Sequence, residues 1–187
     1  MKVFRLNALD GGDAVLKTTA NRITLLRIVL IPLWLVLAYR GLTVPALAVY
    51  IVACLSDLAD GYIARHYNQV TNFGKFMDPL ADKMLVLSAM CFFVERGRIP
   101  GWVVAVVLFR EFAVSGLRLV AVERQRVIAA AWSGKVKTAV TMIALGFMTV
   151  IEYAGTDLVC SVLILATTVY SGTEYFIKNR DVFQDID

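Results

Sequence analysis

The stretch VPALAVYIVACLSDLADGYIAR, residues 44–65, decides the fold class, because an apolar run in it leads directly into carboxylates. Residues 44–56 contain no charged side chain, and Asp57 and Asp60 follow at once. Such a run is typical of a helix that crosses a membrane or lies inside a helical bundle. A charged residue within a membrane span costs about 2.5–3.5 kcal/mol, so these aspartates need a functional explanation.

The composition of the whole chain extends this interpretation. Of its 187 residues, 59% are hydrophobic and 18% are charged, whereas soluble domains carry roughly 25% charged residues. The mean hydropathy is +0.69. The length suits one domain, and the balance of residue types favours lipid as the solvent around it.

Six segments approach the roughly 20 apolar residues that a membrane-spanning helix needs. They cover approximately residues 24–39, 44–63, 79–94, 102–120, 136–151 and 158–177. We therefore predict an all-α integral membrane protein with six transmembrane helices. Residues 1–17 lack the apolar centre of a signal peptide, so we expect residues 1–20 to form an amphipathic segment at the membrane surface.

The distribution of Lys and Arg predicts the orientation, since cytoplasmic loops are enriched in both. With six spans, one side collects Lys2, Arg5, Lys17, Arg22, Arg65, Lys75, Arg118, Arg124, Arg126, Lys135, Lys137, Lys178 and Arg180, and the other holds Arg40, Arg96 and Arg98. We expect both termini on the cytoplasmic side of a cell membrane. This bias explains the isoelectric point near 9.0 without a nucleic-acid partner, and it suits anionic lipid headgroups and phosphorylated substrates.

Four carboxylates stand at the facing ends of the second and third predicted spans. Asp57 and Asp60 share one helix face, and Asp78 and Asp82 share another. All four cannot stay ionised in a half-dry site without cations, and ligation by oxygen alone favours Mg²⁺ or Mn²⁺. Pro79 after Asp78 predicts that Asp78 is the N-cap of the third span.

Small and basic residues accompany these carboxylates. Gly61 and Ala64 allow a ligand to approach the helix backbone closely, and Arg65 suits a bidentate contact with a phosphate. Gly74 is expected in the loop between the two spans, where a backbone without Cβ atoms suits a nucleotide pocket.

Together these residues form the pattern D-x2-D-G-x2-A-R-x8-G-x3-D-x3-D, which runs from Asp57 to Asp82 without a departure in type or spacing. The pattern is the signature of the CDP-alcohol phosphotransferase family, and the chain resembles that family over roughly residues 21–180. Eight fixed residues make this far more specific than a lone glycine pattern.

Further segments resemble one branch of the family, the bacterial phosphatidylglycerophosphate synthases. These segments are Asn21–Arg27 before Ile31-Pro32, Asp78–Lys83, Arg110-Glu111, Ser115–Arg118, Gly134–Thr138 and Tyr170-Ser-Gly. The first 20 residues resemble nothing in the family.

The resemblance implies roles for particular residues. It assigns Asp57, Asp60, Asp78 and Asp82 to metal ions, Asp82 also to general-base catalysis, Asp57, Gly61, Ala64, Arg65 and Gly74 to the CDP group, and Arg110, Arg118, Lys135 and Lys137 to the phosphate of the acceptor. It implies two Mg²⁺ or Mn²⁺ ions and direct displacement, by an alcohol, of CMP from CDP-diacylglycerol. The basic set favours sn-glycerol 3-phosphate as that alcohol.

The resemblance also implies the organisation of the protein. Residues 21–180 are expected to form the catalytic domain, with a juxtamembrane segment at 1–20 and a tail at 181–187. The active site is expected to face the cytoplasm of a multi-pass protein in the inner or plasma membrane, and a homodimer is expected.

Several alternatives stay open at this point. Another acceptor within the family, such as phosphatidylglycerol in a cardiolipin synthase or inositol phosphate, fits the same motif. A divalent-cation transporter or a structural membrane subunit would explain the aspartates, but neither gives Gly61 or Arg65 a role. Lys137 is equally compatible with ordinary anchoring at the cytoplasmic face, whereas Arg110 lies in mid-span beside Glu111.

Overall fold

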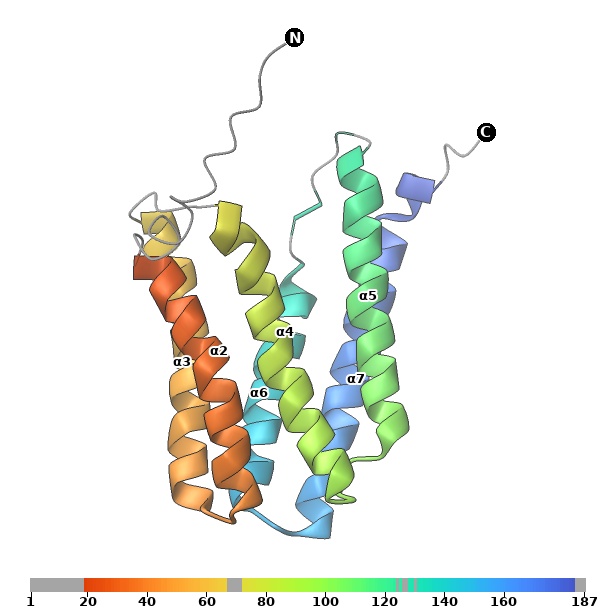
Figure 1. Cartoon of the computed structure of the whole chain (residues 1–187). Coiled ribbons are helices and arrows are strands. Elements are labelled where there is room, and N and C mark those ends of the chain that lie inside the picture. The colour runs from red at the N-terminus through yellow and green to blue at the C-terminus, as the bar shows by residue number, and fades with distance from the viewer. Residues whose placement is uncertain (1–18, 67–71, 124, 126–127, 130, 184–187) are drawn as a thin grey trace. The chain divides into compact units, whose positions relative to one another are not determined.

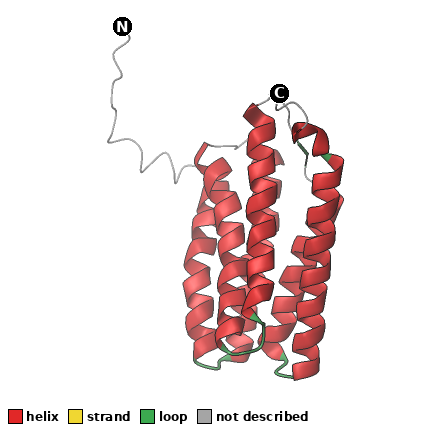
Figure 2. Cartoon of the chain, turned by 90° about the vertical axis from the view of Figure 1, so that its right-hand side faces the viewer, coloured by secondary structure: helices red, strands yellow, loops and turns green. Residues whose placement is uncertain are grey.

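The computed structural model describes residues 19–66, 72–123, 125, 128, 129 and 131–183, and for 19–21, 57–66, 72–76, 78, 79, 82 and 183 it describes the backbone alone. Within these ranges every regular element is a helix, which confirms the all-α prediction (Figure 2). The elements are α2 (Thr19–Tyr39), α3 (Thr43–His66), α4 (Asn72–Glu95), α5 (Gly101–Glu123), α6 (Trp132–Val150), α7 (Ala154–Lys178) and the 3-10 turn η1 (Arg180–Phe183). Residues 1–18 of the predicted surface segment lie outside the described residues.

The helices begin earlier than hydropathy predicts. α4 starts at Asn72, α6 at Trp132 and α7 at Ala154, whereas the apolar segments start at residues 79, 136 and 158. Hydropathy marks only the part of a helix that suits lipid, while backbone hydrogen bonding continues into the polar residues at its end.

The prediction that Asp78 caps a helix is wrong. α4 starts six residues before Asp78, so Asp78 and Pro79 both lie inside the helix. A proline removes one backbone donor from a helix, and membrane helices tolerate this where neighbouring groups compensate. Pro32 lies inside α2 in the same way.

The chain forms two compact units, Met1–Ser88 and Ala89–Asp187. In the first unit α2 and α3 pack side by side as an antiparallel pair (Figure 1). Gly41 makes the turn between them with φ 71°, a conformation that glycine adopts without steric cost.

The core of this helix pair combines aromatic packing with a buried polar contact. Trp34 of α2 and Tyr50 of α3 are almost fully buried, and their ring centroids lie 5.8 Å apart. Arg27, with no exposed surface, donates from Nε to the hydroxyl of Ser56 at 3.1 Å. These contacts fix the register of α2 on α3, the helix that carries Asp57 and Asp60.

The second unit contains α5, α6, α7 and η1. α7 packs against both α5 and α6 (Figure 1). One apolar cluster joins α5, α7 and η1, and it consists of Val114, Leu117, Ala121, Tyr175 and Val182. α7 is thus the helix on which the other elements of this unit assemble.

Two of the described helices are long and apolar enough to cross a membrane, Arg22–Tyr39 and Ala154–Lys178. Large apolar side chains are also widely exposed: Phe109 is 76% and Phe112 70% exposed. Soluble monomers rarely expose apolar surface on this scale, so the helices have the character of a membrane protein. Six spans stay a prediction, because α5 carries Arg110, Glu111 and Arg118 within its length.

A bidentate ion pair joins the first turn of α7 to the turn that precedes α5. Arg98, in the turn between α4 and α5, donates from Nε and Nη2 to the carboxylate of Asp157 at 2.9 and 2.7 Å. Arg98 also donates to the carbonyl of Ile151 at 2.6 Å. Both charged side chains are mostly buried, with 14% and 13% exposed.

Replacing Asp157 by Asn should destabilise the protein, because the substitution leaves the buried Arg98 without a counter-charge. Breaking a buried pair costs about 3–5 kcal/mol, which corresponds to a drop of about 10 °C in melting temperature. The measurement is thermal unfolding in detergent. As a control, Lys178→Gln removes an exposed partner of Glu174 and should change the melting temperature little. Equal melting temperatures for Asp157→Asn and the wild type would contradict the assignment.

Candidate functional site

The four motif aspartates lie on two helix ends of the first unit. Asp57 and Asp60 are in the last turns of α3, which ends at His66, and Asp78 and Asp82 are in the first turns of α4. Each lies within about 15 Å of its helix end at 1.5 Å per residue. The end of α3 and the start of α4 lie at the same end of the unit (Figure 1). The structure describes the backbone of the four aspartates but not their side chains.

The other motif residues lie on the same two helices. Gly61, Ala64 and Arg65 belong to the last turns of α3. Gly74 lies in the first turn of α4, so its predicted place in a loop is wrong. Residues 67–71, between the helices, lie outside the described residues.

The donor chemistry of this motif fits a divalent cation. The side chains that the structure describes contain no group of three His, Cys, Asp or Glu that could hold a metal ion. Four carboxylates on two neighbouring helix ends supply the hard oxygen donors that Mg²⁺ and Mn²⁺ prefer. The backbone spacing places two carboxylates on one face of each helix.

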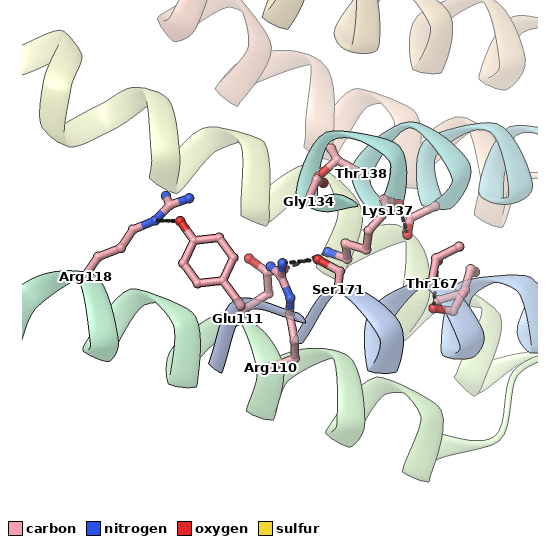
Figure 3. Close-up of polar contacts among 11 residues, drawn as sticks. Arg110, Glu111, Arg118, Gly134, Lys137, Thr138, Thr167 and Ser171 are labelled. Atoms are coloured by element: carbon pink, nitrogen blue, oxygen red, sulfur yellow. Dashed lines mark hydrogen bonds and ion pairs between the residues drawn. The ribbon is translucent and has the colours of Figure 1, made fainter. Parts of the chain in front are cut away.

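The second unit brings two of the predicted basic residues together around an acidic one. Glu111 of α5 accepts hydrogen bonds from Lys137 of α6 at 2.7 Å and from its neighbour Arg110 at 3.0 Å, both through Oε1 (Figure 3). Arg110 also donates from Nη2 to the hydroxyl of Ser171 on α7 at 2.5 Å. These contacts join α5, α6 and α7 through side chains that are largely buried.

Small residues leave room for this network. A Cβ atom on Gly172 would lie 3.1 Å from Cγ of Arg110, a tighter contact than packed side chains normally make. A Cβ atom on Gly134 would lie 3.6 Å from Nη2 of Arg110, an ordinary contact. Gly172 therefore lets the stem of Arg110 pass along α7 and reach Ser171.

Arg118 occupies a separate position two turns along α5. Its Nε donates to the phenol oxygen of Tyr175 at 2.9 Å, and its guanidinium lies 5.3 Å from the centre of that ring. Tyr175 in turn donates to the carbonyl of Ala129 at 2.8 Å. Tyr175 therefore holds Arg118 through Nε, and no described residue is hydrogen-bonded to the terminal nitrogens, which suit an anion.

The exposure of the four basic residues divides them into two pairs. Arg118 and Lys135 are exposed, whereas the side chain of Lys137 is 6% and that of Arg110 12% exposed. Sequence alone predicted the four as one set and did not distinguish the pairs.

Sequence reasoning missed Glu111, Ser171 and Tyr175 as parts of this site. Glu111 was noticed only as the neighbour of Arg110, and Ser171 only within the motif Tyr170-Ser-Gly. Ser171 and Tyr175 are four residues apart and so share a face of α7, a signal that could have linked them.

The chain is similar to known proteins over most of its length. Residues 17–171 match the family described as CDP-alcohol phosphatidyltransferase. A protein of Bacillus subtilis (strain 168), named CDP-diacylglycerol–glycerol-3-phosphate 3-phosphatidyltransferase, is 40% identical over 186 residues, covering 88% of this chain and 96% of the relative. A protein of the same name from Escherichia coli (strain K12) is 36% identical over 171 residues, covering 84% and 92%.

A third relative, from Mycobacterium tuberculosis (strain ATCC 25618 / H37Rv), is 40% identical over 183 residues. It is named "probable phosphatidylglycerophosphate synthase", and the match covers 92% of this chain and 87% of the relative. The matches thus extend over the aspartate motif and over the basic residues alike.

Replacing Tyr175 by Phe removes two hydrogen bonds and keeps the ring beneath Arg118. Each lost bond is worth about 1 kcal/mol, so the free energy of unfolding should fall by about 1–3 kcal/mol. Thermal unfolding in detergent measures this loss. Tyr170→Phe, on the exposed face of α7, is the matched control, and an equal effect of both substitutions would contradict the role given to Tyr175.

Proposed function

The chain belongs to the CDP-alcohol phosphatidyltransferase family, and from this membership we propose that it transfers the phosphatidyl group of CDP-diacylglycerol to sn-glycerol 3-phosphate. The products are phosphatidylglycerophosphate and CMP. The observation that carries the proposal is the complete aspartate motif within a chain 36–40% identical to relatives named for this reaction.

The proposal includes a membrane topology. Residues 21–180 form a catalytic domain of six spans, with residues 1–20 at the membrane surface and 181–187 as a tail. Both termini and the active site face the cytoplasm, which the asymmetry of Lys and Arg supports. A cytoplasmic site gives access to a soluble acceptor, and the bilayer supplies the lipid donor. By likeness to the family, the protein acts as a homodimer.

The motif carboxylates are proposed to hold divalent cations. Members of the family are generally dependent on such metals, and Asp57, Asp60 and Asp78 supply the oxygen ligands here, with Asp82 also within reach of a metal. Two Mg²⁺ or Mn²⁺ ions would neutralise charge on the diphosphate of the donor. Asp57, with Gly61, Ala64, Arg65 and Gly74, would line the CDP group, because small residues let the nucleotide approach the backbone of α3 and α4.

The transfer is a direct displacement at phosphorus. The hydroxyl oxygen of the acceptor forms a bond to the phosphorus next to the diacylglycerol, and the bond from that phosphorus to the oxygen of CMP breaks. Asp82 accepts the proton of the hydroxyl, and CMP leaves with the electron pair. Positioning and charge compensation supply most of the catalysis in transfers of this kind.

The basic residues of the second unit are proposed to select the acceptor. Arg110, Arg118, Lys135 and Lys137 make this region positive, which attracts an alcohol that carries a phosphate. Serine, inositol and choline lack that phosphate. The proposal therefore favours glycerol 3-phosphate over these alcohols.

Release of CMP by the purified protein tests this function. With CDP-diacylglycerol and Mg²⁺ or Mn²⁺, we expect release with glycerol 3-phosphate and none with serine, inositol or choline. Asp82→Asn should lower the rate about 10²–10⁴-fold, because it removes the proposed base. Glu152→Gln, an exposed carboxylate outside the motif, should leave the rate unchanged.

Two results of this assay would contradict the proposal. Release with phosphatidylglycerol or inositol phosphate instead of glycerol 3-phosphate would keep the chemistry and overturn the acceptor. An Asp82→Asn variant as active as the wild type would overturn the base.

Removal of divalent cations tests the role of the aspartates separately. We expect a chelator to abolish CMP release, and added Mg²⁺ or Mn²⁺ to restore it, because the four carboxylates need cations to lie close together. The initial rate at several metal concentrations measures this dependence. Full activity in the presence of excess chelator would contradict the metal role.

A further inference from the structure

We propose that Glu111 is a positioning residue of the acceptor site: it fixes Arg110 and Lys137 in a buried ion-pair network and leaves Arg118 and Lys135 to contact the acceptor's phosphate. The proposal rests on the proposed function, because the acceptor is taken to be a phosphorylated alcohol. It gives Glu111 a role and divides the basic residues into an inner and an outer pair.

The inner pair shares a single carboxylate oxygen. Oε1 of Glu111 lies 2.7 Å from Nζ of Lys137 and 3.0 Å from Nη1 of Arg110. The remaining terminal nitrogen of Arg110 is bound to Ser171. Figure 3 shows these side chains meeting from α5, α6 and α7. A phosphate that took these two hydrogen bonds would have to displace the carboxylate, which offsets one of the two positive charges.

Burial makes that displacement costly. The side chains of Lys137, Arg110 and Glu111 are 6%, 12% and 18% exposed. A charge removed from water is stable only with a partner, and loss of one partner leaves the other uncompensated. Glu111 therefore stays between the two cations, and its negative charge weakens their attraction for a second anion.

The outer pair is placed to meet the acceptor. Arg118 and Lys135 are exposed, and the hydrogen bond that Arg118 makes to Tyr175 uses Nε. Lys135 and Lys137 are two residues apart on α6, so they point to different faces of the helix. The bond from Lys137 to Glu111 fixes the first turns of α6 on α5, and through the backbone it fixes the position of Lys135.

A double-mutant cycle between Glu111 and Lys137 tests this role. The variants are Glu111→Gln, Lys137→Met and the double variant, with Glu111→Asp as the conservative replacement and Ser171→Ala as the control that removes only a neutral partner. For each, we would measure the melting temperature in detergent, kcat, and KM for glycerol 3-phosphate and for CDP-diacylglycerol.

We expect Glu111→Gln to raise KM for glycerol 3-phosphate about tenfold, with kcat within about twofold and KM for CDP-diacylglycerol unchanged. Its melting temperature should fall by about 10 °C. Glu111→Asp should recover part of both losses. In the double variant the ammonium of Lys137 is gone, but Arg110 still lacks its carboxylate. Its melting temperature and its KM for glycerol 3-phosphate should therefore lie between those of Glu111→Gln and those of the wild type. Lys135→Met should raise KM for glycerol 3-phosphate with little change in stability. Arg118→Met should raise this KM as well, with a slightly lower melting temperature because it also removes the hydrogen bond to Tyr175.

Two results would overturn the proposal. Wild-type KM and melting temperature in Glu111→Gln would show that the carboxylate positions nothing. A double variant whose KM for glycerol 3-phosphate exceeds that of Glu111→Gln would show that Lys137 itself contacts the phosphate. Thermal unfolding separates this proposal from the proposed function, because the coupling between Glu111 and Lys137 is measurable even if glycerol 3-phosphate proves not to be the acceptor.

Discussion

An ionised side chain inside a membrane protein needs a compensating charge, because its transfer out of water costs several kcal/mol. Asp157 meets this constraint with Arg98, and Glu111 meets it with Lys137 and Arg110. The proposed role of the motif aspartates follows the same logic, with divalent cations in place of basic side chains. The constraint thus links the stability of the helices to the proposed chemistry.

In the second unit, three polar side chains of α7 each bind an arginine from another part of the unit. Asp157 binds Arg98 near its start, Ser171 binds Arg110 two thirds along, and Tyr175 binds Arg118 near its end. From Asp157 to Tyr175 the helix rises about 27 Å, at 1.5 Å per residue. One face of α7 therefore holds Arg98 in the turn before α5 and Arg110 and Arg118 on α5, although the helix as a whole is apolar enough to span a membrane.

Much of the helical fold and part of the candidate site could be predicted from the sequence, and the wrong predictions have physical causes. Apolar runs predicted a helix near each of α2 to α7, because burial in lipid demands them. The start of α4 and the helical position of Gly74 were mispredicted, since hydropathy does not record where backbone hydrogen bonding begins.

The aspartate motif was recognisable because its members lie within 26 residues. The pairing of Glu111 with Lys137 joins residues 26 positions apart on different helices, and no local pattern reveals such a contact. The roles proposed for the motif residues stay predictions.

The identity of the lipid that the purified protein makes is the most direct test of the proposed function. Protein in vesicles that contain CDP-diacylglycerol would be given isotope-labelled glycerol 3-phosphate and a divalent cation, and the lipid extract analysed by mass spectrometry. We expect a labelled lipid with the mass of phosphatidylglycerophosphate, formed in equal amount to CMP. CMP formed without label in any lipid, or label in a lipid of another mass, would contradict it.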